Sequence, residues 1–461
     1  MLRKSFLLLL IMMFAVLPFW QSTSANEPKK ILGFYTVYYQ GDKSSYQSIA
    51  SFGSYINQVS TVTYRMDTAG KVIGTAPTDA IALAHAGGIQ PYAAVTNEAN
   101  GQFDSQLANA ILSNASVRQS AVQNLLALVR ENGYKGVNID FENMLPSDRA
   151  HFTLFITELS QVLRAHGFET IVSVSAKTSD SPNVAWVGAF DYQALGQAAD
   201  FIQVMTYDQH GPWGSPGPVA GLNWVENVVK YAVSQIPSSK VMIGLPAYGY
   251  EWNTTTNTGN RAVAWKNIPA LLSSTGAVSQ WDATAQSPYF RYTATDGTSR
   301  TVWYENELSI ELKTKLVNTY NLAGVSMWCM RLEDEAFWKA VHKGLGTTVP
   351  AEPTEPALPA ESFTTLAANK AEYLAGEQVT IQTTIKDKNN QPLAGAQVKV
   401  TVTSPSGSVT HYSGTTNSQG SYMIYIKTNK QKAEKGLYVA HAQSSLPNYQ
   451  VSTGETSYRI K

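Results

Sequence analysis

The sequence predicts an α/β protein: a (β/α)8 TIM barrel with a small inserted lobe before its eighth strand, followed by an all-β sandwich. Three observations predict this class. Short β-rich runs alternate with segments of helical period over residues 30–346, a proline-rich stretch follows, and residues 362–461 alternate between apolar and polar with a period of two.

Eight runs have the apolar, β-branched character of buried strands: residues 31–36, 59–64, 89–95, 136–142, 171–176, 201–207, 241–245 and 324–328. Apolar residues recur at helical spacing between them, and the helical segment before the fourth strand ends at Gly133. This alternation favours a closed barrel, with an open doubly wound sheet as the alternative. The long interval before the eighth strand predicts the inserted lobe, with residues 289–292 and 301–304 as a hairpin.

Four prolines recur every three residues within residues 347–361, which is the spacing of a polyproline II linker. Beyond it, period-two runs separated by turns predict an antiparallel sandwich over residues 362–461. Gly395 and the turn at residues 417–420 resemble bacterial immunoglobulin-like modules. That resemblance implies either a spacer or a module that binds the bacterial cell wall.

The amino terminus has the pattern of an export signal. Arg3 and Lys4 precede an apolar run over residues 6–20, and Thr23 and Ala25 have the spacing of a cleavage site. We therefore expect a signal peptide over residues 1–25 and a secreted or cell-wall-associated protein. An uncleaved membrane anchor is the alternative, although the run is short for a span. No later segment has the length and apolar character of an integral membrane segment.

The composition of the chain limits the classes of molecule that it is expected to bind. The 34 basic and 34 acidic residues cancel, so no overall field favours nucleic acid or anionic lipid, and a neutral polysaccharide is the better partner. The 24 Tyr and 10 Trp residues include flat side chains suited to sugar rings. Cys329 is the only cysteine, which excludes an intramolecular disulfide and a thiolate metal cluster. Since the sequence has no metal-ligand or phosphate-binding motif, we expect no metal and no cofactor.

The run Lys135-Gly-Val-Asn-Ile-Asp-Phe-Glu142 carries the strongest chemical signal. On a strand, Asn138, Asp140 and Glu142 share one face, and the two carboxylates lie roughly 6 to 7 Å apart at Cβ. Such a pair separates in pKa, leaving one carboxyl group protonated near neutral pH as an acid and the other charged. Glu142 ends the strand, at the barrel mouth where the chemistry of such barrels takes place. A purely structural pair or a cation site is the alternative.

This run resembles the signature of glycoside hydrolase family 18, Asp-Gly-x-Asp-x-Asp-x-Glu, with Lys135 and Asn138 replacing the first two aspartates. The resemblance implies that Glu142 protonates the glycosidic oxygen and Asp140 orients the N-acetyl group of the substrate, which attacks the anomeric carbon itself. We expect Asn138 to hydrogen-bond Asp140 and to contribute to substrate binding.

Further motifs extend the resemblance. The segment Met205-Thr-Tyr-Asp208 looks like Met-x-Tyr-Asp of the family, which implies that Tyr207 holds the reacting acetamide and that Met205 and Asp208 bind sugar. Trp328, at the end of the eighth strand, matches the tryptophan that forms the floor of the site. Tyr35 lies in a Gly-Phe-Tyr run on the first strand and is expected to bind substrate.

The third strand departs from typical chitinases, because it ends in Val-Thr-Asn97 without their Ser-x-Gly-Gly motif. Together with the sequences around Glu142 and Asp208, this resembles the spore-germination and cortex-lytic N-acetylglucosaminidase branch, and Asn97 is expected to bind substrate. The resemblance favours hydrolysis of β-1,4 bonds at N-acetylglucosamine in peptidoglycan, with chitin next and an N-linked glycan also open. A catalytically inactive glycan-binding protein on the same barrel is the alternative.

Overall fold

The computed structural model describes residues 28–348, 360–446 and 449–461. Within them, eight parallel strands close into a barrel because the first strand pairs with both the second and the last. The predicted TIM barrel is therefore confirmed, and the open sheet is excluded. In order around the barrel the strands are β1 (Lys30–Thr36), β2 (Gln58–Met66), β4 (Gln90–Thr96), β7 (Gly136–Asp140), β8 (Glu169–Ser175), β9 (Phe201–Met205), β10 (Val241–Pro246) and β16 (Gly324–Trp328).

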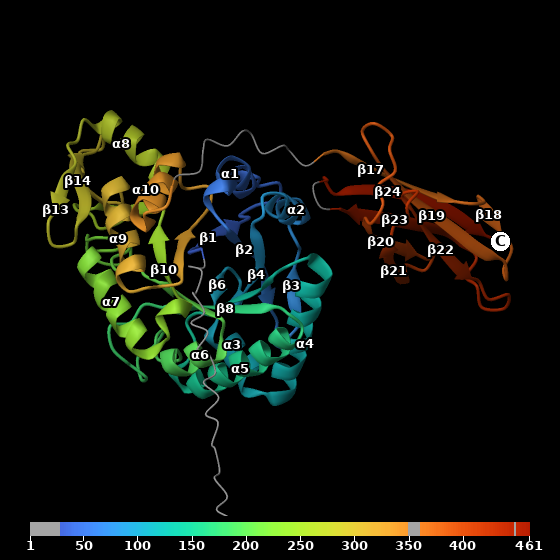
Figure 1. Ribbon diagram of the computed structural model, residues 1–461, viewed down its shortest axis with the longest axis horizontal. Coiled ribbons are helices and arrows are strands. Elements are labelled where there is room, and N and C mark those ends of the chain that lie inside the picture. The colour runs from blue at the N-terminus through green and yellow to red at the C-terminus, as the bar shows by residue number, and fades with distance from the viewer. Residues whose placement is uncertain (1–27, 349–359, 447–448) are drawn as a thin grey trace, which may run out of the picture.

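Helices surround these strands (Figure 1). Helix α4 (Ala115–Asn132) ends at Gly133 as predicted, because this glycine takes a left-handed φ of 73° and caps the last turn. The helices are α1 (Ser44–Phe52), α2 (Thr78–Ala86), α3 (Ser105–Ser113), α4 (Ala115–Asn132), α5 (Arg149–Ala165), α6 (Tyr192–Ala198), α7 (Leu222–Gln235), α8 (Ile268–Thr275), α9 (Glu307–Thr319) and α10 (Glu335–Leu345).

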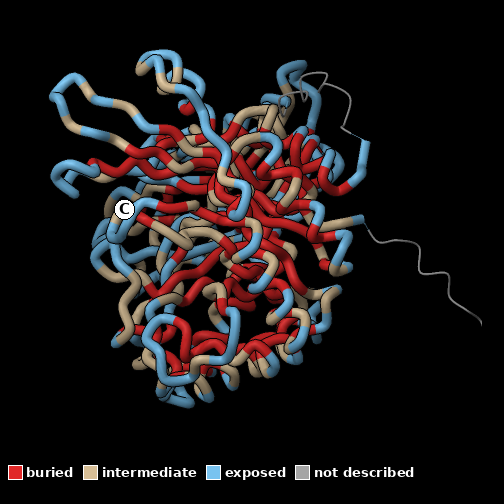
Figure 2. The backbone as a smooth tube through the Cα atoms, turned by 90° about the vertical axis from the view of Figure 1, so that its left-hand side faces the viewer, coloured by how far each residue is buried: buried red, intermediate tan, exposed pale blue. Residues whose placement is uncertain are grey.

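The main apolar core lies between the strands and the helices, and buried backbone runs through the middle of the barrel domain (Figure 2). The barrel interior is also filled. Leu32, Phe34 and Tyr92 belong to a separate apolar cluster, and Nε2 of Gln203 donates to Oγ of Ser326 at 2.9 Å across the interior. Because the interior is packed, chemistry is confined to the mouth at the carboxyl ends of the strands.

The predicted lobe lies between β10 and β16. It contains α8 and an antiparallel sheet in the order β12 (Arg261–Ala264), β11 (Tyr248–Asn253), β15 (Ser299–Trp303), β14 (Ser287–Thr293) and β13 (Gln280–Asp282). The pairing of β14 with β15 is the predicted hairpin. Three minor strands are β3 (Val72–Gly74), antiparallel to β2, and the pair β5 (Glu98–Ala99) and β6 (Gln102–Phe103).

The carboxyl-terminal region is an all-β domain with a core of its own, which includes Val379, Ile381, Val398 and Val400. One sheet has the order β17-β19-β22 and the other β18-β24-β23-β20-β21. The immunoglobulin-like assignment stays a prediction. The strands are β17 (Ser362–Ala368), β18 (Glu372–Tyr373), β19 (Gln378–Asp387), β20 (Gln397–Thr403), β21 (Val409–Thr415), β22 (Ser421–Lys427), β23 (Gly436–Ser445) and β24 (Ser452–Ile460).

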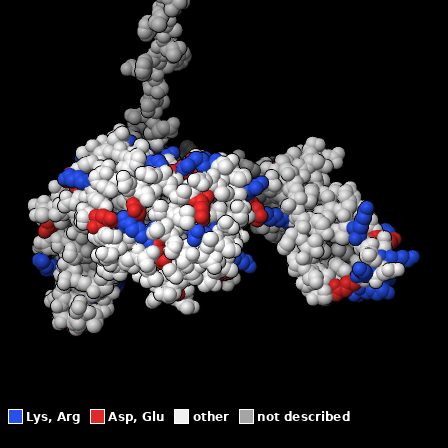
Figure 3. Space-filling model, turned by 90° about the horizontal axis from the view of Figure 1, so that it is seen from below, with Lys and Arg blue, Asp and Glu red and all other residues white. Residues whose placement is uncertain are grey.

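The predicted signal peptide, residues 1–25, lies outside the described residues, as does most of the predicted linker. Among the residues that the structure describes, no helix combines the length and apolar character needed to cross a bilayer. On the face of the barrel domain in Figure 3, basic and acidic side chains are interspersed. That face therefore offers no large patch of one sign to a charged polymer.

Candidate active site

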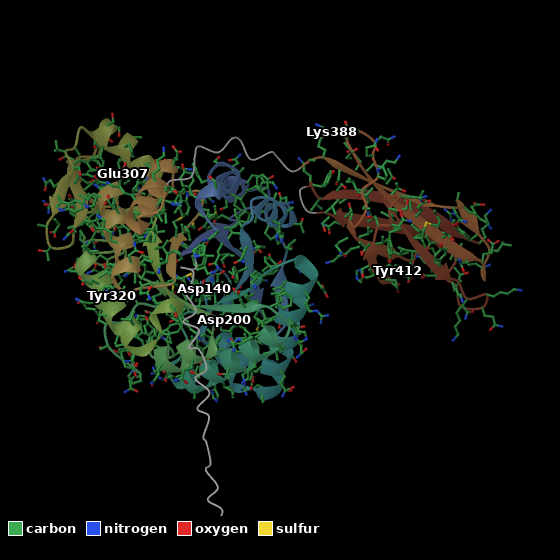
Figure 4. The ribbon with its side chains drawn as sticks, viewed as in Figure 1. Asp140, Asp200, Glu307, Tyr320, Lys388 and Tyr412 are labelled. Atoms are coloured by element: carbon green, nitrogen blue, oxygen red, sulfur yellow. The ribbon has the colours of Figure 1, made fainter. Side chains whose placement is uncertain are left out.

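The two motif carboxylates lie at the mouth of the barrel. Asp140 ends β7 with 5% of its surface exposed, and Glu142 follows two residues later with its side chain partly exposed. The strand is thus shorter than predicted, but its alternation holds: Phe141 faces the helices and stacks on Phe152 and Phe155 of α5. Figure 4 places Asp140 near the middle of the barrel domain.

Burial and nearby negative charge favour the protonated forms of both carboxylates. Loss of hydration, and next the charge of Glu98, raises the pKa of Asp140 to about 7. The pKa of Glu142 is raised well above its usual value by burial first and then by Asp140, Asp208 and Glu98. Both causes favour the protonated form of Glu142, which is the form that a general acid uses.

The expected hydrogen bond between Asn138 and Asp140 is wrong. Asn138 is fully buried; its Nδ2 donates to Oγ of Ser60 at 3.3 Å, and its Oδ1 accepts from Oγ of Ser173 at 3.1 Å. Oδ1 of Asp140 has no hydrogen-bond partner among the described residues. Because its amide is used inside the barrel wall and is shielded from solvent, Asn138 does not form a substrate-binding surface.

Tyr207 and its neighbours come together at the end of β9. Burial raises the pKa of Tyr207 well above its usual value, followed by the charges of Asp140, Glu142 and Asp208. These groups therefore share one electrostatic site. Met205, the last residue of β9, is partly exposed on the same strand face as Tyr207.

Asp208 receives two hydrogen bonds that the sequence did not predict. The hydroxyl groups of Tyr248 and Tyr250 donate to its Oδ1 at 2.6 and 2.8 Å. Burial raises the pKa of Asp208, and these two donors oppose that rise. The alternating Tyr248, Tyr250 and Trp252 share one face of β11, which is a signal that could have marked them.

Trp328 is partly exposed and, like Tyr207, packs against the buried cluster that contains Tyr248 and Tyr250. The expectation for Tyr35 is wrong. Tyr35 is 2% exposed and belongs to the core between the barrel and the helices, so it faces away from the mouth. Its neighbour Phe34 faces inward, with its ring centroid 5.4 Å from that of Trp328.

Asn97 is also misplaced by the sequence prediction, because its side chain has no exposed surface. Its amide instead bonds to the backbone N–H and C=O of Glu142, at 2.8 and 2.9 Å. Glu98, the next residue, was missed, although its charge acts on both Asp140 and Glu142. At the end of the third strand, the buried Asn97 amide thus contacts the backbone of Glu142.

No group of three or more His, Cys, Asp or Glu side chains within residues 28–348, 360–446 and 449–461 has the arrangement of a metal site. The features of the mouth are instead two neighbouring carboxylates, a third acid held by tyrosines, and aromatic side chains. In a TIM barrel this combination is that of a glycoside hydrolase.

Comparison with known proteins gives the family. The model for glycosyl hydrolases family 18 matches residues 91–333, and the chain belongs to that family. It is 37% identical over 317 residues to an uncharacterized glycosylase, YvbX, of Bacillus subtilis (strain 168), covering 68% of this chain and 92% of that protein. It is 31% identical over 247 residues to a cortical fragment-lytic enzyme of the same organism, covering 53% of this chain and 57% of that enzyme.

Solved structures agree with this assignment. A chitinase from Chromobacterium violaceum ATCC 12472 is 36% identical and superposes with a TM-score of 0.65, covering 70% of this chain and 100% of that one. The spore cortex-lytic enzyme SleL of Bacillus cereus is 25% identical with a TM-score of 0.66, covering 71% of this chain and 75% of that one.

Proposed function

We propose that this protein hydrolyses β-1,4 glycosidic bonds at N-acetylglucosamine, with retention of configuration and with the substrate's acetamide as the nucleophile. The observation that carries the proposal is Glu142 at the barrel mouth, partly exposed yet with its pKa raised by burial and by three nearby carboxylates. Such a group supplies a proton to a leaving oxygen at neutral pH.

In the proposed reaction, the proton of Glu142 moves to the glycosidic oxygen as the bond to the anomeric carbon breaks. The acetamide oxygen of the same sugar attacks that carbon, forming an oxazolinium that Asp140 orients and Tyr207 holds by its hydroxyl group. Glu142, now a carboxylate, takes a proton from the water that opens the ring. Trp328, Asp208 and Met205 provide sugar contacts around this centre.

Peptidoglycan is the favoured polysaccharide and chitin the next. The cortical fragment-lytic enzymes of Bacillus support the first, although the chain spans only about three fifths of those relatives. Relatives named di-N-acetylchitobiase and the chitinase structure support the second. Mass spectrometry of the products from purified peptidoglycan and from chitin oligosaccharides shows which polymer is cleaved. Both kinds of product would end in N-acetylglucosamine, but only those from peptidoglycan also carry N-acetylmuramic acid with its lactyl and peptide substituents.

The variant Glu142→Gln tests the proposal. We expect it to fold and to bind glycan but to lose cleavage by at least about 1000-fold, because an amide cannot donate a proton to the leaving oxygen. Glu307→Gln is the control, since Glu307 is exposed on α9 away from Asp140 (Figure 4). Unchanged turnover in Glu142→Gln would show that Glu142 is not the general acid.

A second test addresses the nucleophile. A substrate with a hydroxyl in place of the 2-acetamido group should bind without being cleaved, because it cannot form the oxazolinium, and NMR of the native reaction should show the β anomer first. Rapid hydrolysis of the hydroxyl analogue with a β product would instead mean that a protein carboxylate attacks, and an α product would mean that water attacks directly.

We further propose that the mature protein is secreted or cell-wall associated, with a catalytic domain over residues 30–346, a linker over residues 347–361 and a wall-binding or spacer module over residues 362–461. The separate core of the carboxyl-terminal domain supports independent folding. Residues 361–461 should then sediment with purified cell walls if the domain is a binder. Their complete absence from the wall pellet would leave a spacer role.

A further inference from the structure

The side chain of Asn97 continues the barrel wall where the backbone ladder stops. Strands β4 and β7 stay paired as far as Thr96 and Asp140. Beyond that point, Oδ1 of Asn97 accepts a hydrogen bond from the N–H of Glu142 at 2.8 Å, and Nδ2 donates to the Glu142 carbonyl at 2.9 Å. An amide that engages both backbone groups of one residue imitates the peptide unit of a neighbouring strand.

Asn97 is itself fixed in place. Nδ2 also donates to the carbonyl of Asp104 at 3.0 Å, and the N–H of Asp104 donates to the Asn97 carbonyl at 3.0 Å. Asp104 caps α3 by accepting from two backbone N–H groups of its first turn. The Asn97 amide thus connects Glu142 to the start of a helix, and its full burial keeps it away from substrate.

The backbone after Glu142 needs such support. Asn143 has a left-handed φ of 52°, so the chain turns sharply just past the carboxylate. Nδ2 of Asn143 donates to the carbonyl of Phe103, in the same β5–β6 hairpin that carries Glu98. The Asn143 amide therefore joins this turn to the hairpin, and the Asn97 amide joins it to Asp104, directly after the hairpin.

We propose that Asn97 is a positioning residue: by bonding both backbone groups of Glu142, it sets the direction in which the Glu142 carboxyl group projects from the barrel mouth. The inference rests on the proposed role of Glu142 as the acid. It assigns to the end of the third strand the task of aiming the proton donor. A displacement of about 1 Å at a reacting group can cost about 100-fold in rate.

The variant Asn97→Ala tests the inference on a fluorogenic β-linked N-acetylglucosamine disaccharide. We expect kcat to fall by about 100-fold while KM stays within about twofold, because Asn97 aims the acid without touching sugar. Hydrogen exchange over residues 140–145 should become faster. That measurement does not depend on turnover.

Asn57→Ala is the matched control. The Asn57 amide makes a similar pair of bonds to backbone at the opposite end of the barrel, although to two residues: it accepts from the N–H of Ile31 and donates to the carbonyl of Lys29, each at 2.8 Å. It should lose comparable thermal stability while kcat stays unchanged. An equal fall of kcat in both variants would mean that Asn97 acts only through stability, which would overturn the inference.

Asn97→Asp adds a chemical readout and replaces the alanine variant if that one does not fold. A carboxylate still accepts from Glu142 N–H but cannot donate to its carbonyl, and protonation at low pH restores one donor. We expect kcat relative to wild type to recover as the pH falls. If wild type cleaves glycan and this variant keeps full kcat at every pH, the positioning role of Asn97 is contradicted while the proposed function stands. If wild type cleaves no glycan, the proposed function is contradicted, and hydrogen exchange still shows whether Asn97 holds the backbone of Glu142.

Discussion

The backbone of Gly244 in β10 lies directly against the ring of Tyr207. A Cβ atom built on Gly244 would fall 2.5 Å from Cε1 of that ring and 3.1 Å from the carbonyl oxygen of Val204. No side chain fits in that space without displacing the tyrosine, which also makes an edge contact with Tyr248 at a centroid distance of 6.5 Å. The absence of a side chain at Gly244 therefore sets the position of Tyr207.

We predict that Gly244→Ala lowers kcat by about 10- to 100-fold, since the added methyl group moves the Tyr207 hydroxyl away from the acetamide. Steady-state kinetics on the fluorogenic disaccharide, with a thermal melt, measures this. Gly87→Ala is the control, because the nearest atom to its Cβ would be 3.5 Å away and its φ is −85°. Full activity in Gly244→Ala would show that the ring can shift without loss of function.

Sequence periodicity predicted the barrel well but not every inward face. On β7 the polar residues Asn138 and Asp140 alternate with apolar ones, so the inward face could be identified. All but the first residue of β1 are buried, so no alternation distinguishes Phe34 from Tyr35. The family motif correctly identified the Gly-Phe-Tyr segment of β1 as part of the barrel. Only the three-dimensional register shows that the ring of Phe34, and not that of Tyr35, contacts Trp328.

This register gives a second prediction. Tyr35→Phe should leave kcat and KM unchanged, because the side chain lies in the outer core, whereas Phe34→Leu should raise KM about 10-fold by withdrawing the ring that supports Trp328. Kinetics on chitin oligosaccharides and tryptophan fluorescence of the bound state measure both. A loss of activity in Tyr35→Phe alone would instead support the expectation from the sequence that Tyr35 binds substrate.

The tyrosines on β11 give a third prediction. The two hydroxyl groups that reach Asp208 stabilise its ionised form, so replacing both Tyr248 and Tyr250 with Phe should raise the pKa of Asp208 further. We expect kcat/KM to fall about 10-fold and its pH profile to shift toward higher pH. Tyr292→Phe, with its ring in the lobe, is the control. An unshifted profile in the double variant would mean that Asp208 does not titrate in the reaction.

A fourth prediction concerns stability. Since burial raises the pKa of Asp140 from 3.8 to about 7, the folded protein holds this proton more tightly than the unfolded chain. The contribution of the protonated Asp140 to the free energy of unfolding is fully present below about pH 4 and is lost as the pH rises through 7. Asp140→Asn should therefore exceed wild type in free energy of unfolding by about 1 to 4 kcal/mol at pH 8 and by little at pH 4. Urea titrations at the two pH values measure the difference in free energy of unfolding between the variant and wild type. The same difference at both pH values would contradict this prediction.

The fifth prediction concerns a buried ion pair at the start of α9. Nζ of Lys313 lies 2.6 Å from Oε2 of Glu305, both side chains are fully buried, and Oε1 of Glu305 has no hydrogen-bond partner in the part of the chain that the structure describes. Burial raises the pKa of Glu305 and lowers that of Lys313 even though each offsets the other's charge. The attraction between the two therefore recovers only part of the cost of removing both from water.

Lys313→Met leaves the Glu305 carboxylate buried without its cation, so we expect a loss of about 3 to 5 kcal/mol in the free energy of unfolding. The loss should be larger at pH 8 than at pH 5, because the lone buried carboxyl group must stay protonated in the folded state while the solvent at pH 8 favours its ionised form. The double variant Glu305→Gln with Lys313→Met removes both charges and should recover most of that loss. Urea unfolding of wild type, single and double variants measures the coupling. If the double variant is as unstable as the single one, the cost lies in packing rather than in charge.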